Sequence, residues 1–132
     1  MDFGTIVIGG GGGGIPAYNL NDGTLKGLDG VIDKDMTAAL LGRIIKAKEL
    51  FIITDVENIC LNYKTNSQEI IYDAPASDIA NWLKDGHFWR GSMEPKIQAA
   101  LYFLKYHGTK VIITSIDNIK DAIEGNSGTI IR

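Results

Sequence analysis

The sequence has little cysteine and histidine, and what it has is scattered. Cys60 is the single cysteine, which excludes an internal disulfide and fits a reducing compartment. Its neighbours Ile59 and Leu61 are apolar, and this context favours a packed thiol over a nucleophile. The two histidines, His87 and His107, lie far apart with no cysteine or acid at ligand spacing, so we predict no transition-metal site.

Long apolar runs and an excess of basic residues are also missing. No apolar stretch approaches the roughly 20 residues that a membrane-spanning helix requires. The first residues carry no basic group ahead of an apolar stretch, which argues against a signal peptide. The 13 Lys and Arg against 16 Asp and Glu give a formal charge of −3, whereas non-specific nucleic-acid binders are basic. We therefore expect a cytoplasmic protein with no membrane and no nucleic-acid partner.

The chain does have enough apolar material for one globular domain. It has 132 residues, of which 45% are hydrophobic and 22% are charged. Nearly continuous, β-branched apolar runs predict strands that are covered on both faces, at residues 5–8, 50–54, 111–114 and 129–131. Strands that alternate with helices indicate an α/β fold with a parallel sheet.

Helical periodicity fills the intervals between these runs. The apolar positions that share a helical face form four groups: Met36, Leu40, Ile44 and Ala47; Ile79, Ala80 and Leu83; Ile97, Ala100, Leu101 and Leu104; and Ile119, Ala122 and Ile123. Pro95 stands where the third helix is expected to begin, and Gly125 closes the fourth. The polar segments 16–30 and 57–75 have room for short hairpins.

Six consecutive glycines occupy positions 9–14, directly after the apolar run 5–8. Without side chains, several backbone N–H groups can approach one anion, so the run is typical of a phosphate-binding loop. A flexible linker is the alternative, although linkers usually mix glycine with serine. The dinucleotide fingerprint fails because no helix follows, and the P-loop fails because no Gly-Lys-Ser/Thr follows.

Two lysines stand at predicted helix starts, where the helix dipole disfavours cations. Lys34 lies between Asp33 and Asp35 just before the helix near Met36, and Lys96 follows Pro95. A bound polyphosphate would remove the electrostatic conflict at both lysines, with Asp35 orienting Lys34. The alternative interpretation is an acidic helix cap with solvated lysines.

Ligands of open parallel sheets bind beyond the carboxyl ends of the strands. The glycine run, residues 54–56 and residues 114–117 leave strand ends there, so we expect them to converge.

Four aromatic residues have the chemistry to stack on a base: Tyr63, Trp82, Phe88 and Trp89. Trp82 and Phe88 fit core or lid packing better.

Taken together, several short motifs resemble carbamate kinase, in the amino-acid kinase superfamily. They are Gly-Gly-Gly-Gly-Ile-Pro at 11–16, Leu-Lys-Gly at 25–27, Val-Ile-Asp-Lys-Asp at 31–35, Thr-Asp-Val at 54–56, Gly-His-Phe at 86–88, Gly-Ser-Met at 91–93 with Pro95-Lys96, Ile-Ile-Thr-Ser at 112–115 and Gly-Thr at 128–129. The resemblance implies a three-layer α/β sandwich with a mainly parallel sheet. It also implies that residues 1–132 are a single nucleotide-binding half-domain, the carboxyl-terminal half, with the amino-terminal half absent.

The reaction that the resemblance implies is phosphoryl transfer between carbamoyl phosphate and ADP, giving ATP and carbamate, with Mg²⁺. Family members commonly serve fermentative arginine breakdown and form homodimers. By motif, Lys34 and Lys96 resemble the phosphate-contacting lysines, and Asp35 resembles the acid that organises them. Gly11, Gly12, Gly13 and Gly14 resemble part of the cradle for the transferred group, and Thr54, Asp55, Val56 and Met93 resemble nucleotide-pocket residues.

If the chain holds only half of the family's site, we expect it to bind nucleotide but to catalyse very little turnover, because the family's other half supplies further catalytic contacts. Two further interpretations fit the same motifs. One is a stand-alone ATP/ADP-binding module without catalysis, and the other is an inactive remnant.

Overall fold

The computed structural model describes residues 4–11 and 14–132. Its main sheet has the strand order β3-β7-β8-β6. The strands are β3 (Glu49–Thr54), β6 (Asp73–Ala74), β7 (Lys110–Ser115) and β8 (Thr129–Ile131). β3 pairs with β7 in parallel and β6 pairs with β8 in parallel, while β7 and β8 are antiparallel. The sheet is therefore mainly parallel, as predicted, but it contains one antiparallel pair.

The antiparallel pair follows from the short helix α4 (Ile119–Ile123), which connects β7 to β8. A helix of five residues advances the chain by roughly 7–8 Å, whereas the six residues of β7 span roughly 20 Å. The connection therefore does not carry the chain back to the start of β7. β8 begins beside the end of β7, with Ile113 opposite Thr129, and runs in the opposite direction.

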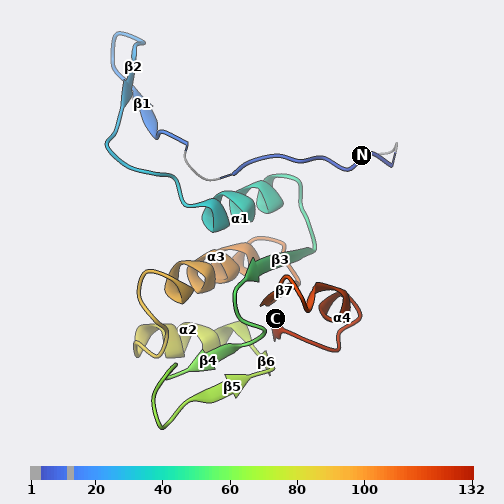
Figure 1. Ribbon diagram of the computed structural model, residues 1–132. Coiled ribbons are helices and arrows are strands. Elements are labelled where there is room, and N and C mark those ends of the chain that lie inside the picture. Colours follow the sequence, from blue (N-terminus) through green and yellow to red (C-terminus); the bar gives the residue numbers. More distant parts are fainter. Residues whose placement is uncertain (1–3, 12–13) are drawn as a thin grey trace.

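Helices cover both faces of the sheet, which makes three layers (Figure 1). α3 (Met93–Lys105) lies between α1 (Lys34–Ile44) and α2 (Ala76–Lys84) on one face, and α4 lies on the other. Successive strand residues point to opposite faces. Accordingly, Val111 and Ile113 of β7 belong to the main core with α3, while the buried Ile112 lies outside that cluster.

α3 is the centre of the core because its apolar stripe meets both neighbouring helices and the sheet. Ile97, Ala100 and Phe103 of α3 are fully buried. Pro95 occupies the third position of α3 and not the first, because the helix already begins at Met93. This position still lies in the first turn, where a missing N–H costs no helical hydrogen bond.

Two short hairpins lie in the segments where the sequence left room for them. β1 (Ala17–Asn19) and β2 (Leu25–Gly27) form an exposed antiparallel pair that projects from the body of the molecule (Figure 1). β4 (Ile59–Leu61) and β5 (Glu69–Ile71) form a second pair. Ile59 and Ile71 of this hairpin are buried, so it is anchored in the core.

The strand predicted at residues 5–8 is wrong for this structure. These residues are extended chain without strand pairing, and Ile6 and Ile8 are 91% and 99% exposed. A strand is stable only when its backbone pairs with a neighbour and its side chains are covered. Neither condition holds at residues 5–8.

Within the described residues, no helix combines the length and the apolar character needed to cross a lipid bilayer.

Candidate functional site

A polar cleft of about 270 Å³ lies where α1 and α3 begin and β3 ends. Three separate stretches of sequence line it: Asp33, Lys34 and Asp35; Thr54 and Asp55; and Gly91, Ser92, Pro95 and Lys96. The sequence predicted that the lysines lie close together, and this is confirmed. The sequence analysis also expected residues 54–56 to converge with the glycine run and with residues 114–117. Thr54 and Asp55 line the cleft, but residues 9–11 and 114–117 do not.

Asp35 links the two lysines of the cleft. The Lys96 Nζ donates to Asp35 Oδ2 at 2.8 Å, and the Lys34 Nζ lies 3.8 Å from the same oxygen. The side chains of Asp35 and Lys96 are each only 12% exposed, whereas that of Lys34 is 62% exposed. Asp35 therefore pairs primarily with Lys96, and not with Lys34 as the sequence suggested. The ammonium of Lys34 stays open to solvent at the rim.

Asp33 acts as the N-cap of α1. Its Oδ1 accepts a hydrogen bond from the Met36 N–H at 2.8 Å, and its backbone is extended, as N-caps require. The acidic cap that the sequence offered as an alternative is thus present together with the lysine pair. The helix cap and the lysine pair are compatible, because Asp33 forms the cap and Asp35 contacts the lysines.

The cleft offers an anion two lysines and the amino-terminal ends of two helices, beside three carboxylates. The amino-terminal ends of α1 and α3 both border it, and each carries a partial positive charge. Asp33 is engaged at the cap and Asp35 at Lys96, so two of the three carboxylates already have partners. The third, Asp55, accepts the Thr54 hydroxyl at 3.0 Å. Lys34 and the helix ends remain to meet a phosphate.

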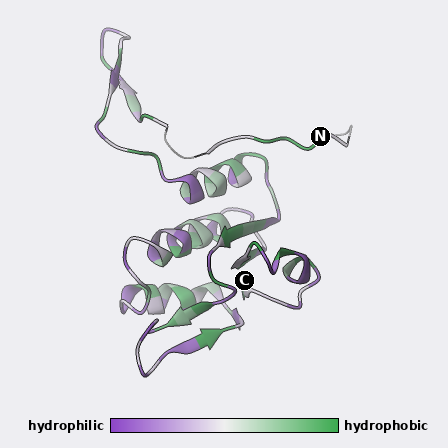
Figure 2. Cartoon of the chain, in the orientation of Figure 1, coloured by the Kyte–Doolittle hydropathy of each residue, from purple (hydrophilic) through white to green (hydrophobic). Residues whose placement is uncertain are grey.

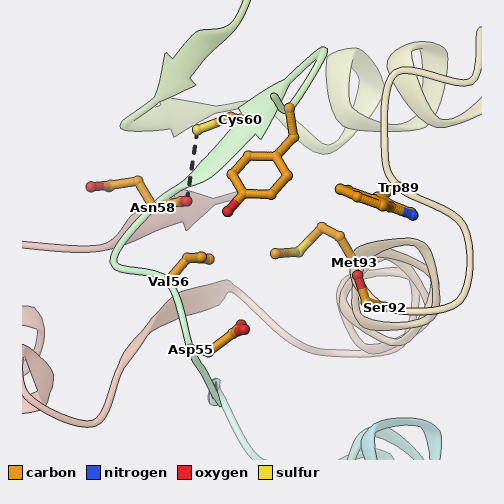
Figure 3. Close-up of a pocket in the computed structure, with 8 residues that line it drawn as sticks. Asp55, Val56, Asn58, Cys60, Trp89, Ser92 and Met93 are labelled. Carbon is orange, nitrogen blue, oxygen red and sulfur yellow. Dashed lines mark hydrogen bonds between the residues drawn. The ribbon is translucent and has the colours of Figure 1, made fainter. Parts of the chain in front are cut away.

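A second, less polar pocket of about 70 Å³ adjoins the cleft and shares Asp55 and Ser92 with it. Its lining residues are Asp55, Val56, Asn58, Cys60, Tyr63, Trp89, Ser92 and Met93. In Figure 3, Val56 and Met93 point toward each other across this pocket. Val56 and Met93, both expected in a nucleotide pocket, therefore lie together. The enclosed volume is well below the roughly 300–1,000 Å³ of typical ligand sites, so a ligand here would also use the open side.

Two of the four aromatic candidates border this pocket. The rings of Tyr63 and Trp89 have centroids 5.9 Å apart and are tilted by 54°. Phe88 is buried in the core and Trp82 packs against it, as the sequence analysis favoured. Tyr63 and Trp89 are therefore the aromatic surfaces available to a flat ligand.

The sequence analysis did not select Asn58, Cys60 or Ser92. Ser92 directly precedes Met93, so its place beside Met93 follows from chain connectivity. Ile59, between Asn58 and Cys60, is anchored to β8, because its N–H donates to the Thr129 hydroxyl at 2.9 Å. No local pattern in the sequence indicates this long-range contact. Partial burial raises the pKa of the Cys60 thiol above its ordinary value, and the Sγ lies 4.0 Å from the Asn58 carbonyl oxygen (Figure 3).

The first three glycines of the run lie in a groove that Lys34 also lines, and they are absent from the lining of the cleft. Gly9, Gly10 and Gly11 line an apolar groove along α1 together with Lys34. The carbonyl of Gly14 accepts the Ile32 N–H at 3.3 Å. Gly12 and Gly13 lie outside the described residues. The cleft-lining residues thus include neither Gly11 nor Gly14.

Across residues 4–11 and 14–132, no group of three or more His, Cys, Asp or Glu side chains is arranged to hold a metal ion.

Known proteins match this chain along its whole length. It is 42% identical to the carbamate kinase of Thermoplasma acidophilum over 128 residues, 97% of this chain and 42% of the relative. It is also 42% identical to the carbamate kinase of Staphylococcus haemolyticus, over 100% of this chain and 43% of that protein. The chain therefore spans about two fifths of the length of these relatives.

Solved structures agree with the sequence comparison. The structure of carbamate kinase from Giardia lamblia bound to AMP-PNP matches with a TM-score of 0.83 at 42% identity, covering 90% of this chain and 41% of that one. The model of the Amino acid kinase family matches residues 1–115. On this evidence the chain belongs to the amino acid kinase family, and it resembles part of a carbamate kinase.

Proposed function

We propose that the chain forms the nucleotide-binding part of a carbamate kinase. The reaction is phosphoryl transfer between carbamoyl phosphate and ADP, giving ATP and carbamate. The observation that carries the proposal is the arrangement of Lys34 and Lys96 around Asp35, in a cleft that continues into the pocket of Val56 and Met93. A polar, cationic end joined to an apolar end matches the two ends of an adenine nucleotide.

Each part of the nucleotide has a partner in this arrangement. Lys34 and the amino-terminal ends of α1 and α3 face the phosphates, while Lys96 approaches them from the inner wall. Thr54 and Asp55 lie where the ribose would pass. The base lies against Val56 and Met93, with Trp89 on its open side. By motif, we assign Gly11, Gly12, Gly13 and Gly14 to the cradle for the transferred group.

The types of residue in the cleft fit phosphoryl transfer, because in this reaction the protein mainly positions the reactants and offsets spread negative charge. Lys34 and Lys96 stabilise the charge that develops on the transferred group. Asp35 keeps Lys96 in place, since their 2.8 Å contact fixes the ammonium. No nucleophilic side chain is required.

Mg²⁺ would neutralise the phosphate oxygens when the nucleotide binds. The ion typically uses one or two carboxylates together with substrate phosphates and water. Asp55 fits this role, because its carboxylate borders both the cleft and the pocket and its partner in the cleft is the neutral Thr54 hydroxyl. The absence of a ready-made ligand cluster among the described residues is compatible with an ion that arrives with the nucleotide.

The same proposal includes the location, metabolic role and assembly that the resemblance implies. They are a cytoplasmic location, fermentative arginine breakdown, small-molecule partners and a homodimer. Its support is the 42% identity to carbamate kinases. Because the chain spans only about two fifths of those relatives, the proposal assigns it nucleotide binding by itself, and turnover only together with the rest of the fold.

Two measurements test this function. Calorimetric titration with ADP and Mg²⁺ is expected to show binding, and mixing the chain with ADP, Mg²⁺ and carbamoyl phosphate is expected to give almost no ATP. Absence of binding heat at millimolar ADP would identify an inactive remnant. Rapid ATP formation by the pure chain would show that the site is already complete.

Single lysine variants assign the binding to the cleft. Lys34→Ala and Lys96→Ala are each expected to weaken ADP binding by about 10- to 150-fold, the range for loss of a charge-assisted contact. Lys120→Ala is the matched control, since Lys120 is an exposed lysine on α4. Unchanged affinity in both cleft variants would refute the phosphate assignment.

A further inference from the structure

Lys64 lies near two aromatic rings at the rim of the apolar pocket. Its Nζ is 5.4 Å from the centroid of the Tyr63 ring and 5.4 Å from the centroid of the Trp89 ring. A cation within about 6 Å of a ring centroid is attracted by the π electrons of the ring. Both rings line the pocket, whereas Lys64 does not, so its ammonium meets the rings from outside the pocket.

The two rings come from different segments of the chain. Tyr63 and Lys64 belong to the turn between β4 and β5, and Trp89 belongs to the loop between α2 and α3. Asn62 and His87 join the same two segments, because Asn62 Oδ1 and His87 Nδ1 form a hydrogen bond of 2.8 Å. The contact of Lys64 with Trp89 therefore adds a second side-chain tie between the turn and the loop, and this tie lies at the pocket.

The backbone of Lys64 has a conformation that suits glycine better than lysine. Its φ is 61°, in the left-handed region that side chains other than those of Asn and Asp rarely enter. The Lys64 N–H donates to Gln68 Oε1 at 2.8 Å, which holds the turn in this shape. Figure 2 shows the hydrophilic colour of the turn next to the hydrophobic colour of β4. Because glycine would remove the strain, the lysine side chain is the feature that needs a reason.

The loop that carries Trp89 is bounded by two residues that allow it to move. Gly86 and Gly91 both have left-handed backbones, with φ of 80° and 83°. Phe88 is buried and anchors the start of this segment, but the neighbouring Trp89 is 52% exposed. The contacts with Tyr63 and Lys64 therefore help to set the orientation of the Trp89 ring.

We propose that Lys64 is a positioning residue for the nucleotide base. Its ammonium holds the rings of Tyr63 and Trp89 together as one wall, and the base stacks on the pocket side of that wall. The proposal rests on the proposed function, since that function places the base in this pocket. The pocket encloses only about 70 Å³, so the base depends on the wall at its open side. A wall that is fixed before binding lowers the entropy cost of ordering it when the base arrives.

Calorimetry with two ligands tests the role of the charge. Lys64→Met keeps the length of the side chain and removes the ammonium, and it is expected to weaken ADP binding by about 2- to 5-fold, the range for an exposed cation–π contact. Tripolyphosphate, which has no base, is expected to bind Lys64→Met as it binds the unsubstituted chain. Lys64→Arg is expected to retain the affinity for ADP, because a guanidinium also binds aromatic faces.

Lys46→Met is the matched control. Lys46 is also an exposed lysine with a left-handed backbone, at φ 56°, but it lines neither the cleft nor the pocket. ADP affinity that is unchanged or higher in Lys64→Met overturns the proposal. So does an equal loss of tripolyphosphate affinity, since Lys64 would then act on the phosphates.

A second measurement needs no nucleotide. The chain has two tryptophans, so Trp82→Phe leaves Trp89 as the only one. In that background, Lys64→Met is expected to lower the residual fluorescence anisotropy of Trp89, because the ring gains motion on the nanosecond timescale. Lys64→Arg and Lys46→Met are expected to leave it unchanged. Equal anisotropy with and without the ammonium of Lys64 overturns the proposal, whereas absence of ADP binding to the unsubstituted chain refutes the proposed function instead.

Discussion

Asp35 and Lys96 are 61 residues apart in the sequence, yet the Lys96 Nζ donates to Asp35 Oδ2 at 2.8 Å. The contact joins the first turn of α1 to the first turn of α3. It also holds the ammonium of Lys96 at the wall of the cleft. The fold and the proposed phosphate site therefore share one ion pair.

Removing the carboxylate at position 35 is expected to destabilise the fold. In Asp35→Asn the mostly buried ammonium of Lys96 loses its anionic partner, which costs about 1.5–3 kcal/mol of unfolding free energy. ADP is expected to restore part of this loss, because its phosphates replace the missing negative charge. Urea denaturation with and without ADP measures both effects.

Glu49→Gln is the matched control for this ion pair. The Lys110 Nζ also lies 2.8 Å from a Glu49 carboxylate oxygen, but these side chains are 35% and 47% exposed. Exposed pairs contribute at most about 1 kcal/mol. Equal destabilisation by the two substitutions would show that burial of Lys96 does not set the energy of its pair with Asp35.

Gly42 of α1 is expected to tolerate no side chain. A Cβ at this position would lie 2.7 Å from the Phe103 ring, at the contact between α1 and α3. Gly42→Ala is therefore expected to destabilise the fold by about 1–3 kcal/mol, as overpacking does, although Ala is the better helix former. In a Phe103→Leu background the added cost is expected to shrink, and a double-mutant cycle by urea denaturation measures the coupling.

Trp89 is expected to contribute to base binding and not to phosphate binding. Loss of an aromatic surface that stacks on a base costs about 1–3 kcal/mol, or roughly 5- to 150-fold in affinity. Trp89→Ala should therefore weaken ADP binding and leave tripolyphosphate binding unchanged. Calorimetry with both ligands separates these effects. Tyr72→Ala, at an exposed aromatic residue outside the pocket and the cleft, should alter neither.

Cys60 is expected to react slowly with iodoacetamide near pH 7. Burial raises the pKa of its thiol, so the neutral form persists to higher pH and the reactive thiolate forms later. The alkylation rate of the folded chain should therefore rise at higher pH than that of the chain in urea. Because Cys60 lines the pocket, ADP should slow the reaction further. Mass spectrometry of the modified chain follows both, and coincident pH profiles would contradict the prediction.

The predicted elements that the structure confirms depend on local patterns. The apolar runs at 50–54, 111–114 and 129–131 are β3, β7 and β8. The periodic segments correspond to the four helices, except that Ala47 lies beyond the end of α1 at Ile44. Two predicted details differ, because a direction and a pairing partner are not local properties. β8 runs antiparallel to β7 since α4 is too short to return the chain, and residues 5–8 remain unpaired for want of a neighbouring strand.

Some residues of the candidate site were recognisable from local sequence patterns, and others depend on how distant segments pack. Lysines at helix starts and the Thr-Asp-Val stretch at 54–56 were recognisable in the sequence because strand ends and helix starts meet at one edge of an α/β sheet. The contributions of Asn58 and Cys60 depend on where the β4–β5 hairpin packs. Local spacing directed Asp35 to its chain neighbour Lys34, whereas the family resemblance assigned it to both lysines. Asp35 lies near both, with Lys96 the nearer.

The amino-acid sequence alone determined the fold class, most of the elements and the family resemblance, because periodicity and short motifs are properties of neighbouring residues. Only the tertiary structure decided that Asp35 holds Lys96, that the polar cleft and the apolar pocket are continuous, and that Lys64 lies near the ring of Trp89. Those relationships join residues tens of positions apart, and they arise only when packing brings the elements together.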